Sequence, residues 1–365
     1  MARIDAFLKL GLAQGCSDLH LAVGVPPMLR MHGDLMPIKF RNLGEAELES
    51  YITEVLTQSQ TNHLQAGNDL DFSYVSTEGG RFRVNVFRKE TGIGAAFRSI
   101  PTKMPSIDQL GLPPIVRKLC DYHQGMVLVT GSTGTGKSTT LAAMIDHLNS
   151  TRSLNIISLE DPIEFVHRSK VSQVIQRELG THLPTFAEGV RAAMREDPDV
   201  ILVGEMRDAE TISMAMTAAE TGHLVLGTLH TTSATKTIDR IIDALPTDER
   251  EQTKSFLSQS LISVITQVLV KSPDQRARRA ICEVMVVTKA IAKLIMTDQA
   301  HQIPSQLQMG RDYGMQLLDQ ALLAAIAAKE VDPDDAYNYA LDKRQFQRFT
   351  TESANLAKVE PVRST

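Results

Sequence analysis

The segment GSTGTGKST at positions 131–139 narrows the possible folds of this chain more than any other stretch. It fits the pattern G-x-x-x-x-G-K-[ST], follows the apolar run MVLVT and precedes the helical pattern TTLAAMIDHL. In this context the glycines let backbone N–H groups surround phosphate oxygens at the positive end of a helix dipole. A glycine-rich turn without a ligand is the alternative. The nucleotide-binding residues that we predict are Gly131, Ser132, Thr133, Gly134, Thr135, Gly136, Lys137, Ser138 and Thr139.

Two residues of this segment have specific expected roles. Lys137 reaches the β- and γ-phosphates of a bound nucleotide, and Ser138 coordinates Mg²⁺. The segment therefore predicts a site for ATP with Mg²⁺.

Short and almost wholly apolar strands follow one another from 125 to about 270, with helical segments between them. They are MVLVT, NIISL, VILVG and LVLGTL. Strands that are buried on both faces and separated by helices indicate a mainly parallel sheet, so the predicted fold class is α/β. Ligands of such sheets bind at the carboxyl ends of the strands, which is where catalytic side chains are expected.

Two of these strand ends carry candidate site residues. Glu205 follows the strand of DVILVGEMRD, where it can hold Mg²⁺ through water or orient the attacking water; a solvated carboxylate is the alternative. In GHLVLGTLHTTS, His230 follows the strand and His223 precedes it. A histidine at the γ-phosphate can donate a hydrogen bond and report the nucleotide state. The spacing of the two histidines does not match a zinc motif.

A third strand ends in the acidic segment ISLEDPIEF at 157–165. Pro162 stops the strand, so Glu160, Asp161 and Glu164 are expected at the same sheet edge as the phosphate loop. One of these three carboxylates is a candidate general base or water-orienting group. A capped turn with solvated acids is the alternative.

The first 100 residues alternate strand and helix patterns. RFRVNVF at 81–87 and GIGAAFR at 92–98 predict a hairpin with arginines on one face, and the proline-rich stretch at 100–114 indicates a linker. Helical spacing in IAKLIM and QLLDQALLAAIAAK indicates C-terminal helices. The predicted divisions are an N-terminal domain at 1–100, a linker at 101–114, a nucleotide-binding domain at 115–290 and a helical subdomain with a polar tail at 291–365.

Composition excludes several other classes. A net charge of −5 and an aromatic content of 5% argue against nucleic acid as a partner. Cys16, Cys120 and Cys282 form no CxxC pair and are expected to be reduced, buried thiols. No apolar run reaches the ~18 residues of a membrane span, and MARIDAFLKLG lacks the apolar core of a signal peptide. We therefore expect a cytoplasmic protein.

The order of these motifs resembles a known family. GSTGTGKST, ISLEDPIEFVH, MREDPDVILVGEMRD and AETGHLVLGTLHTTSATKTIDRIID are similar to motifs of the secretion ATPases of type II secretion and type IV pili, the GspE/PilT family, and most closely to its PilT-type pilus retraction ATPases. SDLHL, GVPPMLRMHGDL and GRFRVNVF extend the similarity towards the N-terminus. The resemblance thus covers nearly the whole chain.

The resemblance implies roles for the candidate residues. Lys137 and Ser138 bind nucleotide and Mg²⁺ (Walker A), Glu205 is the Walker B acid, and Glu164 is the catalytic glutamate of the Asp box. His223 and His230 form the His box. It also implies a PAS-like N-terminal domain, a RecA-like ATPase domain and a homohexamer at the inner membrane, where a platform protein of the pilus and a paralogous retraction ATPase are the expected partners. The implied activity is ATP hydrolysis that powers pilus retraction and twitching motility.

In such rings the N-terminal domain packs against the ATPase domain of a neighbouring subunit. Arg83 and Arg98, and as a third candidate Arg81, are then positioned to approach the phosphates and stabilise the charge of the transition state. A solvated charged strand face is the alternative.

One motif departs from the family pattern. The retraction ATPases carry AIRNLIRE in the C-terminal region, and the matching stretch here is AIAKLIMT at 290–297, with Ala292 and Met296 in place of the two arginines. This departure leaves the ATPase assignment intact but keeps an auxiliary motor of the PilU kind as an alternative to the principal retraction motor.

Three further alternatives remain. An assembly or secretion motor would usually have a longer N-terminal region and often a four-cysteine zinc motif, which this sequence lacks. A RecA-like helicase or recombinase conflicts with the acidic charge and the family motifs. A regulatory subunit that binds nucleotide without turnover would need neither Glu164 nor Glu205, which are both present.

Overall fold

The computed structural model describes residues 2–31, 34–77, 79–100 and 104–351. Contacts between Cα atoms divide the chain into two units. The first comprises Met1–Met104 and Pro162–Val166, and the second comprises Pro105–Asp161 and His167–Thr365. Residues 101–103 of the expected linker and most of the expected polar tail lie outside the described residues.

The first unit contains an antiparallel sheet, six-stranded over the described residues, in the order β3-β2-β1-β6-β5-β4. Apolar residues of α1 and α2 pack on one face of this sheet and form its core. The elements are α1 (Asp5–Gln14), β1 (Asp18–Ala22), β2 (Met28–Met31), β3 (Asp34–Pro37), α2 (Glu45–Thr53), α3 (Gln58–Gln65), β4 (Leu70–Val75), β5 (Arg81–Lys89) and β6 (Gly92–Ile100).

The expected hairpin is confirmed as β5 and β6, which pair with Arg83 opposite Arg98. Phe82, Val84 and Val86 alternate inward along β5 and are buried. This alternation leaves the arginines on the other face, as the period of two predicts.

The second unit is built on a sheet that has seven strands within the described residues, in the order β13-β12-β7-β11-β10-β8-β9. All neighbours are parallel except β12 and β13. The predicted α/β class is therefore confirmed. The strands are β7 (Gly125–Thr130), β8 (Asn155–Glu160), β9 (Gln173–Glu178), β10 (Val200–Val203), β11 (Leu224–Leu229), β12 (Leu261–Lys271) and β13 (Arg278–Val286). Of these, β9, β12 and β13 were not among the strands expected from the sequence.

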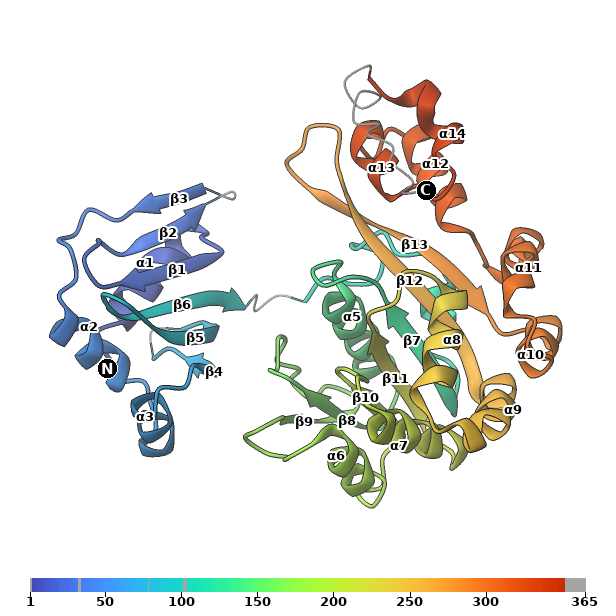
Figure 1. Ribbon diagram of the computed structural model, residues 1–365, viewed down its shortest axis with the longest axis horizontal. Helices are drawn as coiled ribbons and strands as arrows, with labels where there is room; N and C mark the ends of the chain where they lie inside the picture. The colour runs from blue at the N-terminus through green and yellow to red at the C-terminus, as the bar shows by residue number, and fades with distance from the viewer. Residues whose placement is uncertain (1, 32–33, 78, 101–103, 352–365) are drawn as a thin grey trace, which may run out of the picture. The chain divides into compact units, whose positions relative to one another are not determined.

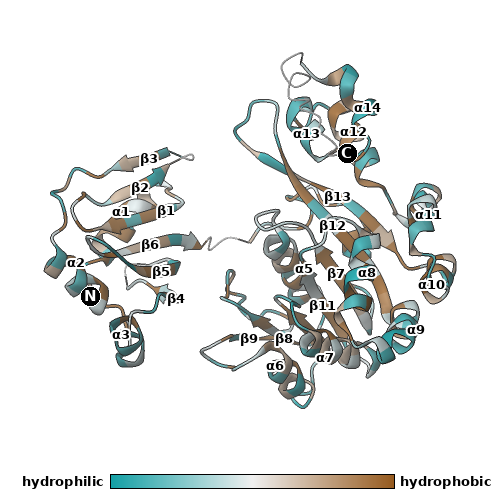
Figure 2. Cartoon of the chain, viewed as in Figure 1, coloured by the Kyte–Doolittle hydropathy of each residue, from teal (hydrophilic) through white to brown (hydrophobic). Residues whose placement is uncertain are grey.

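Helices cover both faces of this sheet (Figure 1). On one face lie α4 (Ile115–Leu119) and α5 (Lys137–Thr151), and on the other α6 (Phe186–Ala193), α7 (Ala209–Glu220), α8 (Ala234–Ala244) and α9 (Arg250–Ser260). Figure 2 shows the sheet as a hydrophobic layer between these helices. β7 and β11 are buried along their whole length. Polar side chains of these segments are therefore expected beyond the strand ends, at the edge of the sheet.

The C-terminal helices follow β13, which is an edge strand of this sheet. They are α10 (Lys289–Met296), α11 (Ile303–Met309), α12 (Leu318–Ala327), α13 (Pro333–Tyr339) and α14 (Lys343–Phe346), with short 3₁₀ turns at Thr247–Glu249, Ala300–Gln302, Arg311–Tyr313 and Gln347–Phe349. Helices α12 to α14 share a separate small core with β12 and β13. No helix among the described residues is both long enough and apolar enough to cross a membrane.

The three cysteines are free and buried, as expected. Burial raises the pKa of Cys120 and of Cys282 to about 12, so both remain protonated thiols.

A buried carboxyl group connects two of the helices. Glu283 of β13 is 4% exposed, and its Oε1 atom accepts a hydrogen bond from the backbone N–H of Ala234 at 2.8 Å, at the start of α8. The backbone of Leu318, at the start of α12, also hydrogen-bonds this carboxyl group. Burial nevertheless dominates and raises the pKa of Glu283.

Glu283→Gln should reveal this raised pKa. The native fold holds a proton on Glu283 more tightly than the unfolded chain, so its contribution to stability is complete below the ordinary glutamate pKa of 4.5 and is lost as the pH rises towards the folded value. We expect the melting temperature of Glu283→Gln, relative to the native chain, to rise as the pH increases above 4.5. A difference in melting temperature that is constant with pH would contradict this expectation.

Candidate functional site

The phosphate loop requires backbone conformations that favour glycine. β7 ends at Thr130, α5 begins at Lys137, and between them Gly131, Gly134 and Gly136 have φ of 140°, 81° and 86°. A Cβ atom on Gly131 would lie 2.4 Å from the backbone oxygen of Gln267. The neighbouring backbone therefore excludes a side chain at Gly131, and the positive φ disfavours one at Gly134 and Gly136.

A buried glutamine of the neighbouring strand supports this loop. Gln267 of β12 is 2% exposed, and its Nε2 atom donates to the backbone oxygen of Thr135 at 2.6 Å. Its Oε1 atom accepts from Thr140 Oγ1 at 2.7 Å. Gln267 was not among the residues expected from the sequence, although a glutamine inside the apolar run LISVITQVLV is a signal that its amide hydrogen-bonds a buried group.

The lysine of the loop is folded back over the loop backbone. Lys137 Nζ donates to the backbone oxygens of Gly131 at 2.9 Å and Ser132 at 3.0 Å, and it lies 3.5 Å from His230 Nδ1. Ser138 follows it in the first turn of α5. The ammonium group thus lies where the loop N–H groups and the helix dipole also favour an anion.

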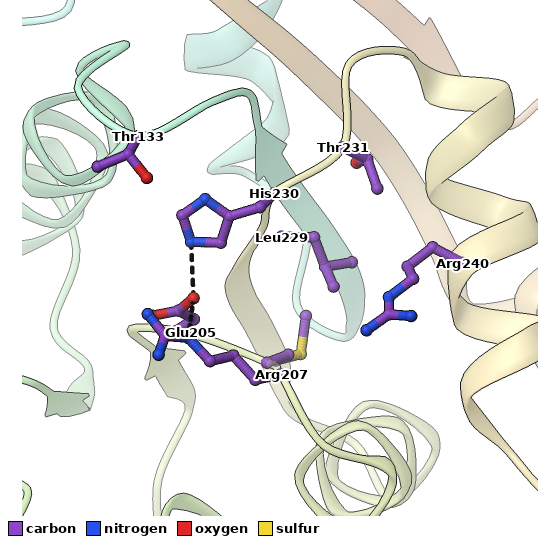
Figure 3. Close-up of a pocket in the computed structure, with 8 residues that line it drawn as sticks. Thr133, Glu205, Arg207, Leu229, His230, Thr231 and Arg240 are labelled. Atoms are coloured by element: carbon purple, nitrogen blue, oxygen red, sulfur yellow. Dashed lines mark hydrogen bonds and ion pairs between the residues drawn. The ribbon is translucent and has the colours of Figure 1, made fainter.

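Glu205 and His230 meet at the carboxyl ends of the neighbouring strands β10 and β11. His230 Nε2 lies 2.6 Å from Glu205 Oε1, and Arg207 Nε donates to the same oxygen (Figure 3). The hydrogen bond to Glu205 raises the pKa of Arg207. A cavity of about 480 Å³ opens beside this cluster, lined by Thr133, Glu205, Met206, Arg207, Leu229, His230, Thr231 and Arg240. Arg207 and Arg240 were not anticipated from the sequence.

The acidic segment after β8 is divided between the two units. Glu160 ends β8 and accepts hydrogen bonds from Ser158 Oγ at 2.7 Å and Gln176 Nε2 at 2.9 Å. Asp161 is the last residue of Pro105–Asp161 in the second unit, whereas Glu164 lies in Pro162–Val166, which belongs to the first unit. Within the second unit, Glu160 therefore has structural partners, and the role of Glu164 remains a prediction.

His223 lies apart from this cluster within the second unit, and the candidate arginines belong to the first unit. His223 precedes β11 and its Nδ1 atom contacts the backbone oxygen of Ala218 at 2.8 Å, so it stands at the opposite end of the strand from His230. In the first unit, Arg98 Nε donates to Asp18 Oδ1 at 2.9 Å. Arg83 is paired with Arg98 in register, and Arg81 precedes it on β5. Their roles at a phosphate remain predictions.

Comparisons with known proteins agree with this geometry. A model of the type II/IV secretion system proteins matches residues 13–332. The chain belongs to this family. It is 46% identical over 333 residues to the type IV pilus retraction ATPase PilT of Pseudomonas aeruginosa, covering 91% of this chain and 96% of the relative. It is 36% identical over 336 residues to the type IV pilus ATPase PilU of the same organism, covering 92% and 88%.

A solved structure extends the similarity to three dimensions. The crystal structure of the pilus retraction motor PilT with bound ADP superimposes with a TM-score of 0.89 at 40% sequence identity, over 95% of this chain and all of the other. The family assignment, the α/β architecture and the homology to PilT are thereby established for this chain. The bound ADP of that motor supports nucleotide binding in this fold.

Gln267→Leu tests the support of the phosphate loop. The substitution leaves the buried Thr135 carbonyl without its donor, which costs about 1–3 kcal/mol, and 1.4 kcal/mol corresponds to a factor of ten. We therefore expect the Kd for ADP, measured by calorimetry, to rise roughly tenfold. Gln316→Leu is the matched control, because it removes a 2.7 Å bond to the backbone oxygen of Cys282 on the outer side of β13. Equal Kd values for Gln267→Leu and the native chain would refute the role of Gln267.

Proposed function

We propose that this chain is a hexameric motor ATPase that hydrolyses ATP to power retraction of a type IV pilus, and thereby twitching motility. The observation that carries the proposal is the pairing of Glu205 and His230 beside a complete phosphate loop, in a chain homologous to PilT over almost its whole length. The expected site of action is the cytoplasmic side of the inner membrane, at a platform protein of the pilus.

The residues of the second unit suit a nucleotide with Mg²⁺. No group of three or more His, Cys, Asp or Glu side chains able to hold a metal occurs among the residues that the structure describes, so a resident all-protein metal site is not expected there. Mg²⁺ typically binds through one or two protein oxygens together with phosphate oxygens and water. Ser138 would supply one oxygen and Glu205 would act partly through water. Bound Mg²⁺ neutralises charge on the phosphates during hydrolysis.

Each proposed catalytic residue has a distinct task. Lys137 leaves the loop carbonyls and binds the phosphates, and His230 senses the γ-phosphate through its contact with Glu205. Glu164 orients or deprotonates the attacking water. Arg83 and Arg98, with Arg81 as a third candidate, act from the first unit of a neighbouring subunit; a solvated strand face remains the competing interpretation.

Turnover per subunit tests the proposal. If arginines of a neighbour complete the site, ATP hydrolysis per subunit in the presence of Mg²⁺ rises steeply with protein concentration and then reaches a plateau. Arg83→Ala and Arg98→Ala should then lower the plateau by on the order of 10³-fold, the typical contribution of an arginine finger. Turnover that stays constant down to concentrations where the protein is monomeric would exclude the trans arginines. Nucleotide binding without turnover at any concentration would favour the regulatory subunit.

The altered motif AIAKLIMT at 290–297 bears on whether this chain is the principal or an auxiliary retraction motor. In α10, Ile291 and Ile295 are buried, whereas Ala292 is half-buried and Met296 is 42% exposed. The apolar side of the helix is therefore retained, and the two family arginines would stand on its outer side. The higher identity to PilT than to PilU favours the principal motor, and the altered motif favours the auxiliary one.

The double substitution Ala292→Arg with Met296→Arg distinguishes these possibilities. Because both positions lie on the outer side of α10, we expect unchanged ATP turnover and a melting temperature within about 2 °C of the native value. If the motif couples hydrolysis to the pilus machine, the twitching zone of a strain that carries this chain as its only retraction ATPase should widen. An unchanged zone would show that this chain needs no arginines in the motif.

A further inference from the structure

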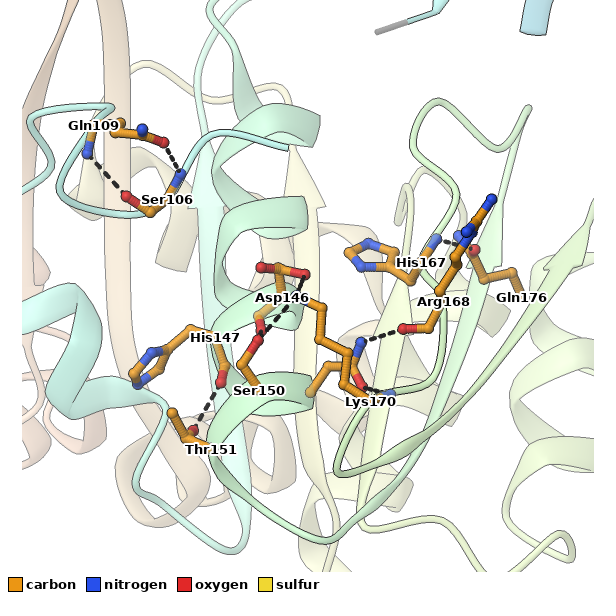
Figure 4. Close-up of polar contacts among 11 residues, drawn as sticks. Ser106, Gln109, Asp146, His147, Ser150, Thr151, His167, Arg168, Lys170 and Gln176 are labelled. Carbon is orange, nitrogen blue, oxygen red and sulfur yellow. Dashed lines mark hydrogen bonds and ion pairs between the residues drawn. The ribbon is translucent and has the colours of Figure 1, made fainter. Parts of the chain in front are cut away.

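The chain between β8 and β9 leaves the sheet as an acidic loop, defined here as residues 161–167, and one side chain closes its base. Gln176 of β9 donates from Nε2 to Glu160 Oε1 at 2.9 Å, just before the loop. Its Oε1 atom accepts from the backbone N–H of His167 at 2.8 Å, at the end of the loop (Figure 4). A single amide thus holds both ends of a loop that carries Glu164 at its centre.

The segment that follows, residues 168–172, is attached to the phosphate-loop helix α5. Asn149 is fully buried, and its Nδ2 atom donates to the backbone oxygen of Arg168 at 2.8 Å. Its Oδ1 atom accepts from the backbone N–H of Lys170 at 2.9 Å. The backbone oxygen of Asn149 accepts from Val171 at 2.9 Å and from Ser172 at 3.3 Å. One residue of α5 therefore makes four hydrogen bonds to this segment.

A second, more exposed layer reinforces the attachment. Lys170 Nζ lies 2.6 Å from Asp146 Oδ1 and 3.0 Å from Ser150 Oγ, both on α5 (Figure 4). This surface ion pair contributes little by itself. The amide hydrogen bonds are the more rigid connection, because the side chain of Asn149 is fully buried and has no water with which to replace its partners.

The other end of α5 is the phosphate loop. Lys137 is its first residue, and Asn149 lies twelve residues further on, roughly 18 Å along the same unbroken helix. A displacement of the helix by phosphates at its N-terminus therefore also moves the anchor of the acidic loop at its C-terminal end.

We propose that Asn149 and Gln176 are positioning residues that couple the phosphate loop to the two ends of the acidic loop, so that nucleotide binding restrains the stretch of chain that carries Glu164. Neither residue belongs to the phosphate loop: Asn149 lies near the C-terminal end of α5 and Gln176 lies in β9. The consequence for catalysis depends on the proposed ATPase function, whereas the mechanical coupling does not.

Hydrogen exchange of the full-length protein tests the coupling without requiring turnover. In Asn149→Ala, the amides of 161–172 should exchange at least tenfold faster than in the native chain in the absence of nucleotide. Saturating ADP should slow exchange in both 131–139 and 161–172 of the native chain, but only in 131–139 of the variant. Asn155→Ala is the matched control, because Asn155 Nδ2 also donates to two backbone oxygens, of Glu196 at 2.8 Å and Asp197 at 2.9 Å, away from the acidic loop. Unaltered exchange at 161–172 in Asn149→Ala would overturn the coupling.

Kinetics then separate positioning from binding. We expect Asn149→Ala and Gln176→Leu each to lower kcat by about 10- to 100-fold while the Kd for ADP changes less than twofold, and Asn155→Ala to change neither. A fall in ADP affinity that accounts for the lost turnover would overturn the positioning role. If the native chain binds ADP but does not hydrolyse ATP, the proposed function fails, and the exchange experiment still decides the coupling. If Asn149→Ala does not fold, Gln176→Leu provides both measurements, with faster exchange expected at 161–167.

Discussion

The hydrogen bonds between Gln267 and the phosphate loop are the interaction on which the site depends. The loop turns through three glycines with positive φ, which contribute no side chains of their own to hold it. Gln267 supplies that support from β12, with one bond to Thr135 and one to Thr140. Because the loop is fixed in this way, α5 begins at Lys137 and presents its N-terminus to an anion.

Helix α5 connects the phosphate loop to other parts of the second unit. Its C-terminal turns hold the segment after the acidic loop, while the strand ends next to it bring Glu205 and His230 together. The carboxyl group of Glu283 hydrogen-bonds the backbone at the start of α8, which follows His230, and at the start of α12. It thereby links the site to the C-terminal helices. Buried polar groups, each bonded to backbone atoms far away in sequence, thus connect elements that apolar packing alone would leave free to slide.

Much of this architecture could be predicted from the sequence. Apolar runs identified the four parallel strands β7, β8, β10 and β11, alternation identified the β5–β6 hairpin, and the glycine pattern identified the phosphate loop, because these signals are local. Gln267, Gln176 and Asn149 were missed, since a polar residue acquires its meaning from a partner that only the fold brings near. The strands β12 and β13 were also missed. Polar residues such as Gln267 and Glu283 interrupt their apolar pattern, and their partners are known only from the fold. Likewise, no local pattern shows that Pro162–Val166 belongs to the first unit.

Helix α10 also combines buried residues that keep its packing with surface residues that can vary. A chain of this family can therefore keep its nucleotide site while the surface that contacts a partner changes. In α10 the residues that face the core, Ile291 and Ile295, preserve the packing of the helix. Met296 is exposed and Ala292 is half-buried, so substitutions at these two positions change the surface of the helix more than its packing on the sheet that holds Glu205 and His230. In the proposed motor, phosphate binding and hydrolysis would rest on the buried residues of the sheet, and coupling to a partner would rest on outward positions such as these. Relatives with the same site can therefore drive different machines.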